Sequence, residues 1–401
     1  MTPPPPRVLF LTSESPHTGA AGAIVFQRLF SGYPADRLLV VTSHLPPENT
    51  GRLPCRYVSL PLRVDRLNRT RFWRWRTALR VLGGAAWLDL GAVDRVLAGF
   101  QPDVVVTLMQ DAWYYDYAAR YARRRSLPLV LFIHDLPDGF EPVASWLRPR
   151  QQRRDGDVYR QAVRRLCISD PMRAHFQSAF GVDGEVLPPP RAAAPVSQPP
   201  ALCGELKTPG RLVLGYAGGL HYGYGEQIVR MLPVLRETGT ILELYGPRPA
   251  GVLESLNAAT DVLRFNGYAP TPEDAWRGLL ARCDALIQPY LNPPGEHHRQ
   301  YRTHFPSKLG DCLALGLPLL ITGPADAAGT AWCLARPGSA LAVTDPAPAA
   351  LARALARLRE EATLRVALAA AGQTASGEFA PEILRARMTD AFRSASAPPP
   401  A

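Results

Sequence analysis

The sequence predicts an α/β protein with two domains, each a parallel sheet covered by helices. Two observations lead to this prediction. Short continuous apolar runs alternate with helical patterns, and the alternation restarts once, after a segment rich in proline and alanine. Buried strands of a parallel sheet are continuous apolar runs because helices cover both of their faces. A length of 401 residues is sufficient for two domains.

The first half of the chain opens with an apolar run, a glycine-containing loop and a helical pattern, which is the start of an α/β unit. Further apolar runs bounded by polar residues predict four more strands. The five strands are predicted at residues 7–13, 36–44, 102–109, 127–135 and 164–170, with helices at 24–30, 114–125 and from 171 to about 180.

The Pro- and Ala-rich segment has no periodicity and is the best linker candidate. After it, strands are predicted at 211–219, 239–246, 262–268, 284–290 and 317–323, and an amphipathic helix at 380–392. We therefore expect a first domain at 1–190, a linker at 191–210, a second domain at 211–379, a C-terminal helix at 380–394 and a disordered tail at 395–401.

Composition excludes several classes of protein. The chain is 47% hydrophobic and 20% charged, as expected of a globular protein. No apolar run reaches the ~18 residues of a membrane span, and the N-terminus lacks the features of a signal peptide. The six cysteines are scattered without a CxxC pair, which argues against a disulfide framework or a zinc site. A cytoplasmic location is the simplest expectation.

Several motifs follow the predicted strands. The second half contains LVLGYAGGL (212–220), LELYGP (242–247), RFNGY (264–268) and FPSKLGDCLALGLPLLITG (305–323), and the first half contains FIHD (132–135) and CISDPM (167–172). Over nearly its whole length, the chain resembles GT-B glycosyltransferases of the family 4 type. The resemblance implies two facing Rossmann-like domains and a C-terminal helix that returns to the first domain.

The resemblance also implies an activity. The protein would move a sugar, of the hexosyl type, from a nucleoside-diphosphate sugar to a saccharide or lipid-linked acceptor. Transfer would retain the anomeric configuration and would serve bacterial polysaccharide or glycan biosynthesis. No metal or other cofactor is expected from the resemblance.

Lys308 is the strongest candidate in the second domain, because the chain has only one other lysine, Lys207. Ligands of open parallel sheets sit outside the carboxyl ends of the strands, and glycine turns there let the backbone approach a phosphate. A compact ammonium ion would offset the charge that develops on a leaving diphosphate. A surface lysine is the alternative interpretation.

The resemblance assigns the remaining donor-binding residues. Asp311 would bond the ribose hydroxyls; the alternative is a solvated helix residue. Tyr268 would stack on the nucleobase; the alternative is a half-buried core tyrosine. The backbone contacts to the donor would come from Gly218, Gly219, Gly246 and Ser307.

In the first domain, the resemblance implies that His134 is catalytic and faces the donor sugar or the acceptor; a core histidine is the alternative. Gly19 and Gly22 would form the loop on the acceptor side, although a tight turn would explain them too. No metal ligands are predicted, because the adjacent His297 and His298 do not share a helix face.

Three departures from the family pattern leave a second function open. Thr303 occupies the position of a family glutamate, eight residues before Asp311. The segment after the glycine turn, His221–Gln227, lacks the usual basic residue, and the loop 291–304 is long and basic, with Glu296, Arg299 or Arg302 as substitutes. The alternative function is a catalytically degenerate GT-B protein that binds nucleotide or glycan as an interaction module. A nucleotide-sugar epimerase or hydrolase is a third reading, whereas the absence of GxGxxG argues against a dehydrogenase.

The basic residues are concentrated in residues 1–200, which contain 26 basic and 17 acidic residues. The stretch Arg63 to Arg80 holds seven arginines and three aromatic residues. This pattern suits an anionic membrane surface, which would make the protein peripheral at the inner face of the plasma membrane. A solvated or core-packed helix face is the alternative, and nucleic acid is the least favoured partner.

Overall fold

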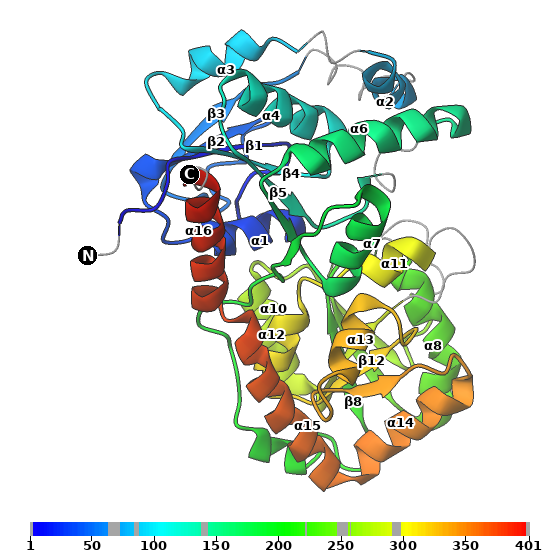
Figure 1. Cartoon of the computed structure of the whole chain (residues 1–401). Coiled ribbons are helices and arrows are strands. Elements are labelled where there is room, and N and C mark those ends of the chain that lie inside the picture. The colour runs from blue at the N-terminus through cyan, green and yellow to red at the C-terminus, as the bar shows by residue number, and fades with distance from the viewer. Residues whose placement is uncertain are drawn as a thin grey trace. The chain divides into compact units, whose positions relative to one another are not determined.

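The computed structural model describes residues 3–62, 73–83, 88–137, 143–220, 223–246, 256, 258–290 and 298–397. The chain divides into two compact units (Figure 1). Unit 1 comprises Met1–Pro190, Thr303–Ser307 and Pro381–Ala401, and unit 2 comprises Arg191–Arg302 and Lys308–Ala380. Each unit is a parallel sheet with helices packed on it, so the predicted α/β class is confirmed.

Unit 1 contains a seven-stranded parallel sheet with the order β3-β2-β1-β4-β5-β6-β7. Its strands are β1 Val8–Thr12, β2 Leu38–Thr42, β3 Arg56–Ser59, β4 Val104–Leu108, β5 Leu129–Ile133, β6 Arg164–Cys167 and β7 Glu185–Val186. Its helices are α1 Ala21–Phe30, α2 Trp73–Val81, α3 Leu90–Leu97, α4 Ala112–Arg124, α6 Arg148–Gln161, α7 Asp170–Phe180 and α16 Pro381–Ser396. Because β1 pairs with both β2 and β4, the strand order reverses there, and such a switch point is where open α/β sheets bind ligands.

Unit 2 contains a six-stranded parallel sheet with the order β10-β9-β8-β11-β12-β13. Its strands are β8 Val213–Ala217, β9 Ile241–Tyr245, β10 Leu263–Gly267, β11 Ala285–Pro289, β12 Leu319–Thr322 and β13 Leu341–Val343. Its helices are α8 Tyr224–Thr238, α10 Pro272–Arg282, α11 His298–Thr303 (whose last residue belongs to unit 1), α12 Leu309–Ala314, α13 Ala328–Leu334, α14 Pro348–Glu360 and α15 Ala362–Ala375. The switch point of this sheet lies between β8 and β11.

The ten predicted strands are all present, and their positions follow from burial. Every residue of β1, β2, β4, β5 and β11 is buried, as the apolar runs predict. The sequence did not reveal β3, β7 and β13, which lie at the ends of the sheets and whose residues are partly or fully exposed. An edge strand is covered less than a central strand, so it carries no continuous apolar run.

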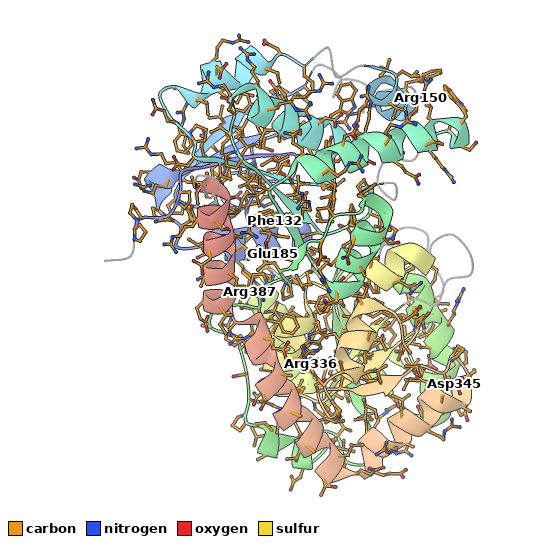
Figure 2. The ribbon with its side chains drawn as sticks, in the orientation of Figure 1. Phe132, Arg150, Glu185, Arg336, Asp345 and Arg387 are labelled. Carbon is orange, nitrogen blue, oxygen red and sulfur yellow. The ribbon has the colours of Figure 1, made fainter. Side chains whose placement is uncertain are left out.

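The C-terminal helix α16 is part of the core of unit 1, which confirms the predicted return to the first domain. Leu384, Met388 and Phe392 repeat every four residues and are fully buried against the sheet. The ring of Phe392 lies 6.3 Å from that of Phe132, which Figure 2 shows within unit 1. The helix continues to Ser396 and so includes the first two residues of the expected tail.

The Pro-rich segment expected as a linker is packed against unit 2. Its 3-10 helix Pro200–Gly204 lies on α15 and is held by the buried guanidinium of Arg365. Arg365 donates from Nε to the Cys203 carbonyl and from Nη2 to the Gly204 carbonyl, both at 2.8 Å. Its Nη1 donates to the Leu358 carbonyl near the end of α14, so one side chain joins three segments of unit 2.

A second buried arginine fixes α2 to unit 1. Arg80 has no exposed surface, and its guanidinium bonds Asp116 of α4 at 2.9 and 3.1 Å and Asp155 of α6 at 2.8 Å. The hydroxyl of Tyr115 donates to the same Asp155 oxygen at 2.7 Å. The buried Arg76 also bonds Asp111, at 2.8 Å. These two arginines of the stretch 63–80 are therefore structural, which favours the core-packed interpretation for them; residues 63–72 lie outside the described part.

We expect Arg80→Ala to lower the free energy of unfolding by about 3–5 kcal/mol, because it leaves two buried carboxylates without their cation. Urea denaturation measures this loss. Arg95→Ala is the matched control, since Arg95 pairs with Asp89 on the surface, where an ion pair contributes at most about 1 kcal/mol. Equal effects of the two substitutions would contradict the structural role of Arg80.

Candidate functional site

The carboxyl edge of the unit 2 sheet is lined by glycines in backbone conformations that other residues avoid. Gly218 follows β8, Gly246 follows β9 and Gly323 follows β12, with φ of 150°, 154° and 144°. Gly267, the last residue of β10, has φ of 76°. The chain can therefore turn at each of these strand ends, and a ligand can approach the backbone closely there because no side chain is in the way.

Two of these glycines approach each other closely. A Cβ atom on Gly246 would lie 2.1 Å from the carbonyl oxygen of Gly218. The Gly218 amide donates to the Tyr245 carbonyl, and the Gly246 amide donates to the Gly267 carbonyl, both at 2.9 Å. The backbone ladder thus continues past the strands, and only glycine fits at position 246.

Lys308 extends to the same strand end. Its Nζ donates to the Ala217 carbonyl at 2.8 Å and lies 3.6 Å from the centre of the Tyr216 ring. A Cβ atom on Gly218 would lie 2.5 Å from this nitrogen. Burial lowers the pKa of Lys308 to about 7. These contacts exclude the alternative of a surface lysine and put a titrating ammonium group directly beside the glycine turn.

The other candidates in unit 2 differ in their surroundings. Asp311 is 6% exposed, and its Oδ1 accepts the Ala192 amide at 2.8 Å, so it is not a solvated helix residue. Tyr268 is 72% exposed, which excludes the alternative of a half-buried core tyrosine. The hydroxyl of Tyr216 donates to the carbonyl of Gly219 at 2.8 Å.

In unit 1, His134 follows β5 and packs flat against Phe26 of α1. The two ring centres are 4.9 Å apart and the rings are 5° from parallel. Burial lowers the pKa of His134 to about 4, so the imidazole is neutral at physiological pH. A neutral ring can donate one hydrogen bond and accept another, which suits contact with sugar hydroxyls better than with phosphate.

The segment Thr303–Ser307 belongs to unit 1 and is held there by two side-chain contacts. Ser169 donates to the Thr303 carbonyl at 2.8 Å, and His304 Nδ1 lies 3.1 Å from Asp135 Oδ1. Ser307, the last residue of this segment, is partly buried. No sequence pattern could reveal the pair of Asp135 and His304, because 169 positions separate the two residues.

The predicted acceptor-side loop contains Gly19 and Gly22, and neither has a positive φ. A Cβ on Gly19 would lie 3.0 Å from His17, and one on Gly22 would lie 3.4 Å from Glu14 Oε1. Packing between loop residues, rather than turn geometry, therefore favours glycine here. Glu14 is a further candidate that the sequence interpretation missed.

The remaining candidates from the sequence lie outside the described residues or form other contacts. His221, Glu296 and His297 lie outside the described residues, as do the side chains of His298 and Arg299. Arg302 pairs with Asp326 at 2.9 Å. Within the described residues, no three His, Cys, Asp or Glu side chains form a metal-binding group, and no helix is long and apolar enough to cross a bilayer.

Residues 6–190 match the model of a family described as the glycosyl transferase 4-like domain. The first half of the chain is thus similar to a glycosyl transferase 4-like domain. The resemblance inferred from the motifs is thereby confirmed, and the match supports glycosyl transfer as the general activity. No sequence match was found among the curated proteins.

Solved structures with the same fold cover nearly the whole chain. HepE from Anabaena, solved with UDP and glucose, has 16% identity and a TM-score of 0.64 over 97% of this chain and 100% of that chain. Sucrose-phosphate synthase from Thermosynechococcus elongatus has 14% identity and a TM-score of 0.67, over 97% and 98%. The lipopolysaccharide outer core galactosyltransferase WaaB has 13% identity and a TM-score of 0.61, over 96% and 99%. These similarities establish the GT-B fold.

We expect Gly246→Ala to lower the free energy of unfolding by about 3 kcal/mol or more, because its Cβ meets a backbone oxygen and its φ is strained. Gly267→Ala is the matched control: its φ is also positive, but a Cβ there has no atom within 4 Å, so strain alone costs about 1–2 kcal/mol. Thermal unfolding of both variants measures the difference, and equal losses would contradict the close approach at Gly246.

Proposed function

We propose that the protein moves a sugar from a nucleoside-diphosphate sugar to a saccharide or lipid-linked acceptor, with retention at the anomeric carbon. The observation that carries this proposal is the position of Lys308, whose Nζ lies at the end of β8 beside the close pair Gly218 and Gly246. A cation beside a glycine turn, where a ligand can approach the backbone closely, is what a diphosphate needs.

The donor would bind along the carboxyl edge of the unit 2 sheet. Lys308 would offset the charge on the diphosphate, with backbone contacts from Gly218, Gly219, Gly246 and Ser307. The exposed ring of Tyr268 is free to stack on a base. Asp311, whose Oδ1 accepts from the Ala192 amide, would bond the ribose hydroxyls. HepE was solved with UDP, so uridine diphosphate is the first nucleotide to test.

The reaction needs no separate base in this scheme. The bond between the anomeric carbon and the diphosphate oxygen breaks, and its electron pair stays on the diphosphate. The acceptor oxygen bonds the same carbon, and its proton passes to the leaving phosphate. Lys308 stabilises the leaving group, and neutral His134 contacts the transferred sugar. Electrostatic stabilisation by the protein replaces a metal ion here.

The expected pathway and location belong to the same proposal. WaaB, which has the same fold, is named for the outer core of lipopolysaccharide. We place this protein likewise in bacterial polysaccharide or glycan biosynthesis, in the cytoplasm at the inner face of the plasma membrane.

A non-catalytic role in binding nucleotide or glycan is the second candidate. It is favoured by Thr303, which replaces a family glutamate and is buried with its carbonyl bonded to Ser169. The bond from Ala192 to Asp311 favours it too. Turnover of a nucleotide sugar separates the two functions.

The first test is thermal stabilisation by a panel of nucleoside diphosphates. We expect one diphosphate, at millimolar concentration, to raise the melting temperature of the wild type and not that of Lys308→Ala. Lys207→Ala, which removes the other lysine at an exposed position, is the matched control and should respond as the wild type does. Absence of any response in the wild type would contradict a donor site at Lys308.

The pH dependence of this binding tests Lys308 more closely. The pKa of Lys308 is about 7 in the empty site, and a bound diphosphate favours the charged form. Binding therefore takes up a proton above about pH 7, and the affinity should fall by up to about tenfold per pH unit as the pH rises from 7 to 9. Calorimetry in buffers of different ionisation enthalpy measures the proton uptake, which Lys308→Ala should abolish.

A peripheral membrane contact would bring the enzyme to a lipid-linked acceptor. Trp75 of α2 is 59% exposed and Trp146, just before α6, is 66% exposed. The helices α2 and α6 pack together, and Arg148, Arg150 and Arg153 of α6 are exposed; Figure 2 labels Arg150 at this end of α6. Exposed tryptophans beside arginines suit an anionic lipid surface.

We expect the wild type to sediment with vesicles of phosphatidylglycerol and phosphatidylcholine at low salt. The double variant Trp75→Ser, Trp146→Ser should bind at least about tenfold more weakly, because two interfacial anchors are lost. Leu334→Ser, which removes an exposed apolar side chain from unit 2, should bind as the wild type does. Undiminished binding by the double variant would argue against this surface.

A further inference from the structure

Glu14 is a carboxylate held at the carboxyl edge of the unit 1 sheet, two residues beyond the end of β1. Thr12 Oγ1 both accepts the Glu14 amide and donates to the Glu14 carbonyl, each at 3.1 Å, which fixes the backbone at this position. The carboxylate accepts the amide of Ala23, in the first turn of α1. The carboxylate occupies space that is open because residue 22 is a glycine. A Cβ atom on Gly22 would lie 3.4 Å from Glu14 Oε1.

This carboxylate has no cationic partner among the side chains that the structure describes. Among the described side chains, no Arg, Lys or His forms an ion pair with Glu14, although the residue is partly buried. Burial raises the pKa of Glu14. A partly buried carboxylate without a counter-ion destabilises the fold, and such groups occur more often where a ligand uses them.

Glu14 and His134 both lie near the start of α1. Glu14 bonds Ala23, and His134 stacks on Phe26, which is three residues further along the same helix. In the sheet, only β4 separates β1 from β5, so both side chains follow strand ends at the switch point of unit 1. The loop of Gly19 and Gly22 runs between them in the sequence.

The charges at this edge indicate the chemistry of its ligand. The carboxylate is an acceptor of hydrogen bonds, and the neutral imidazole can donate or accept. The other titratable groups nearby are His17, whose pKa is lowered mainly by burial, and the pair of Asp135 and His304. A phosphate would be repelled by Glu14, whereas a sugar hydroxyl would donate to it.

We propose that Glu14 binds a hydroxyl group of a saccharide acceptor and holds it at the start of α1. The inference rests on the proposed function and adds the residue that recognises the acceptor. The structural alternative is that Glu14 does nothing more than cap α1. The substitution Glu14→Gln separates capping from acceptor binding. The glutamine retains an oxygen that accepts the Ala23 amide but loses the negative charge that strengthens the bond to a hydroxyl.

The test measures transfer from UDP-glucose, or from the sugar of the diphosphate that the panel selects, to methyl glycosides of glucose, galactose, mannose and N-acetylglucosamine. For the glycoside that the wild type uses, we expect Glu14→Gln to lower kcat/KM for the acceptor by about 10- to 100-fold. The affinity for the nucleoside diphosphate and the melting temperature should stay close to wild type. Glu185→Gln, at an exposed carboxylate on β7, is the matched control.

The pH profile adds a readout that capping alone would not change. The charged form of Glu14 is the one that accepts a hydroxyl, so kcat/KM for the acceptor should fall as the pH falls through its raised pKa. Glu14→Gln should abolish this acid limb. If Glu14→Gln transfers the sugar as fast as the wild type and has the same pH profile, the proposed role of Glu14 in acceptor binding is wrong. A wild type that releases no nucleoside diphosphate from any donor would instead overturn the proposed function.

Discussion

The candidate donor site depends on the close approach of two backbones at the ends of β8 and β9. Gly246 leaves no room for a Cβ against the Gly218 carbonyl, and Gly218 leaves none against the Lys308 ammonium. Because neither glycine has a side chain, the ammonium group of Lys308 lies directly beside the backbone that follows β8. The candidate site thus combines an ammonium group with backbone that a ligand can approach closely, and this combination is the basis of the proposed diphosphate site.

The two units present different chemistry at their sheet edges. Unit 2 presents a cation beside open glycine turns, which suits an anionic ligand. Unit 1 presents a neutral imidazole and a carboxylate that forms no ion pair among the described residues, and both suit uncharged hydroxyl groups. This difference is what a transferase needs when one substrate carries a diphosphate and the other is a saccharide. It arises from a few residues at strand ends, while the strands themselves are apolar in both units.

Arginine has two roles in this chain, and the net charge alone does not distinguish them. Arg80 and Arg365 are buried and join segments far apart in the sequence through carboxylates or carbonyls. Arg148 and Arg150 remain exposed on α6. The excess of basic residues in the first half therefore overstates the charge available to an anionic partner, since part of it is used inside the fold.

The sequence by itself determined the α/β class and ten of the strands, and it singled out Lys308 as a candidate. These features are local: an apolar run, a glycine turn or one rare residue is visible in a short window. It also carried the family resemblance, because the motifs at the strand ends are short and contiguous. The edge strands β3, β7 and β13 were not predicted, since partially exposed strands contain no continuous apolar run.

Only the tertiary structure decided which side chains are free and which are already bonded. It bonded Asp311 to Ala192, enclosed Arg80 between two carboxylates, exposed Tyr268 and joined His304 to Asp135. It also buried much of Glu14 near the start of α1, with no ion-pair partner in the described part of the chain. These outcomes depend on partners up to 169 residues apart. A sequence pattern reports residue type and spacing, whereas burial and pairing are properties of the packed chain.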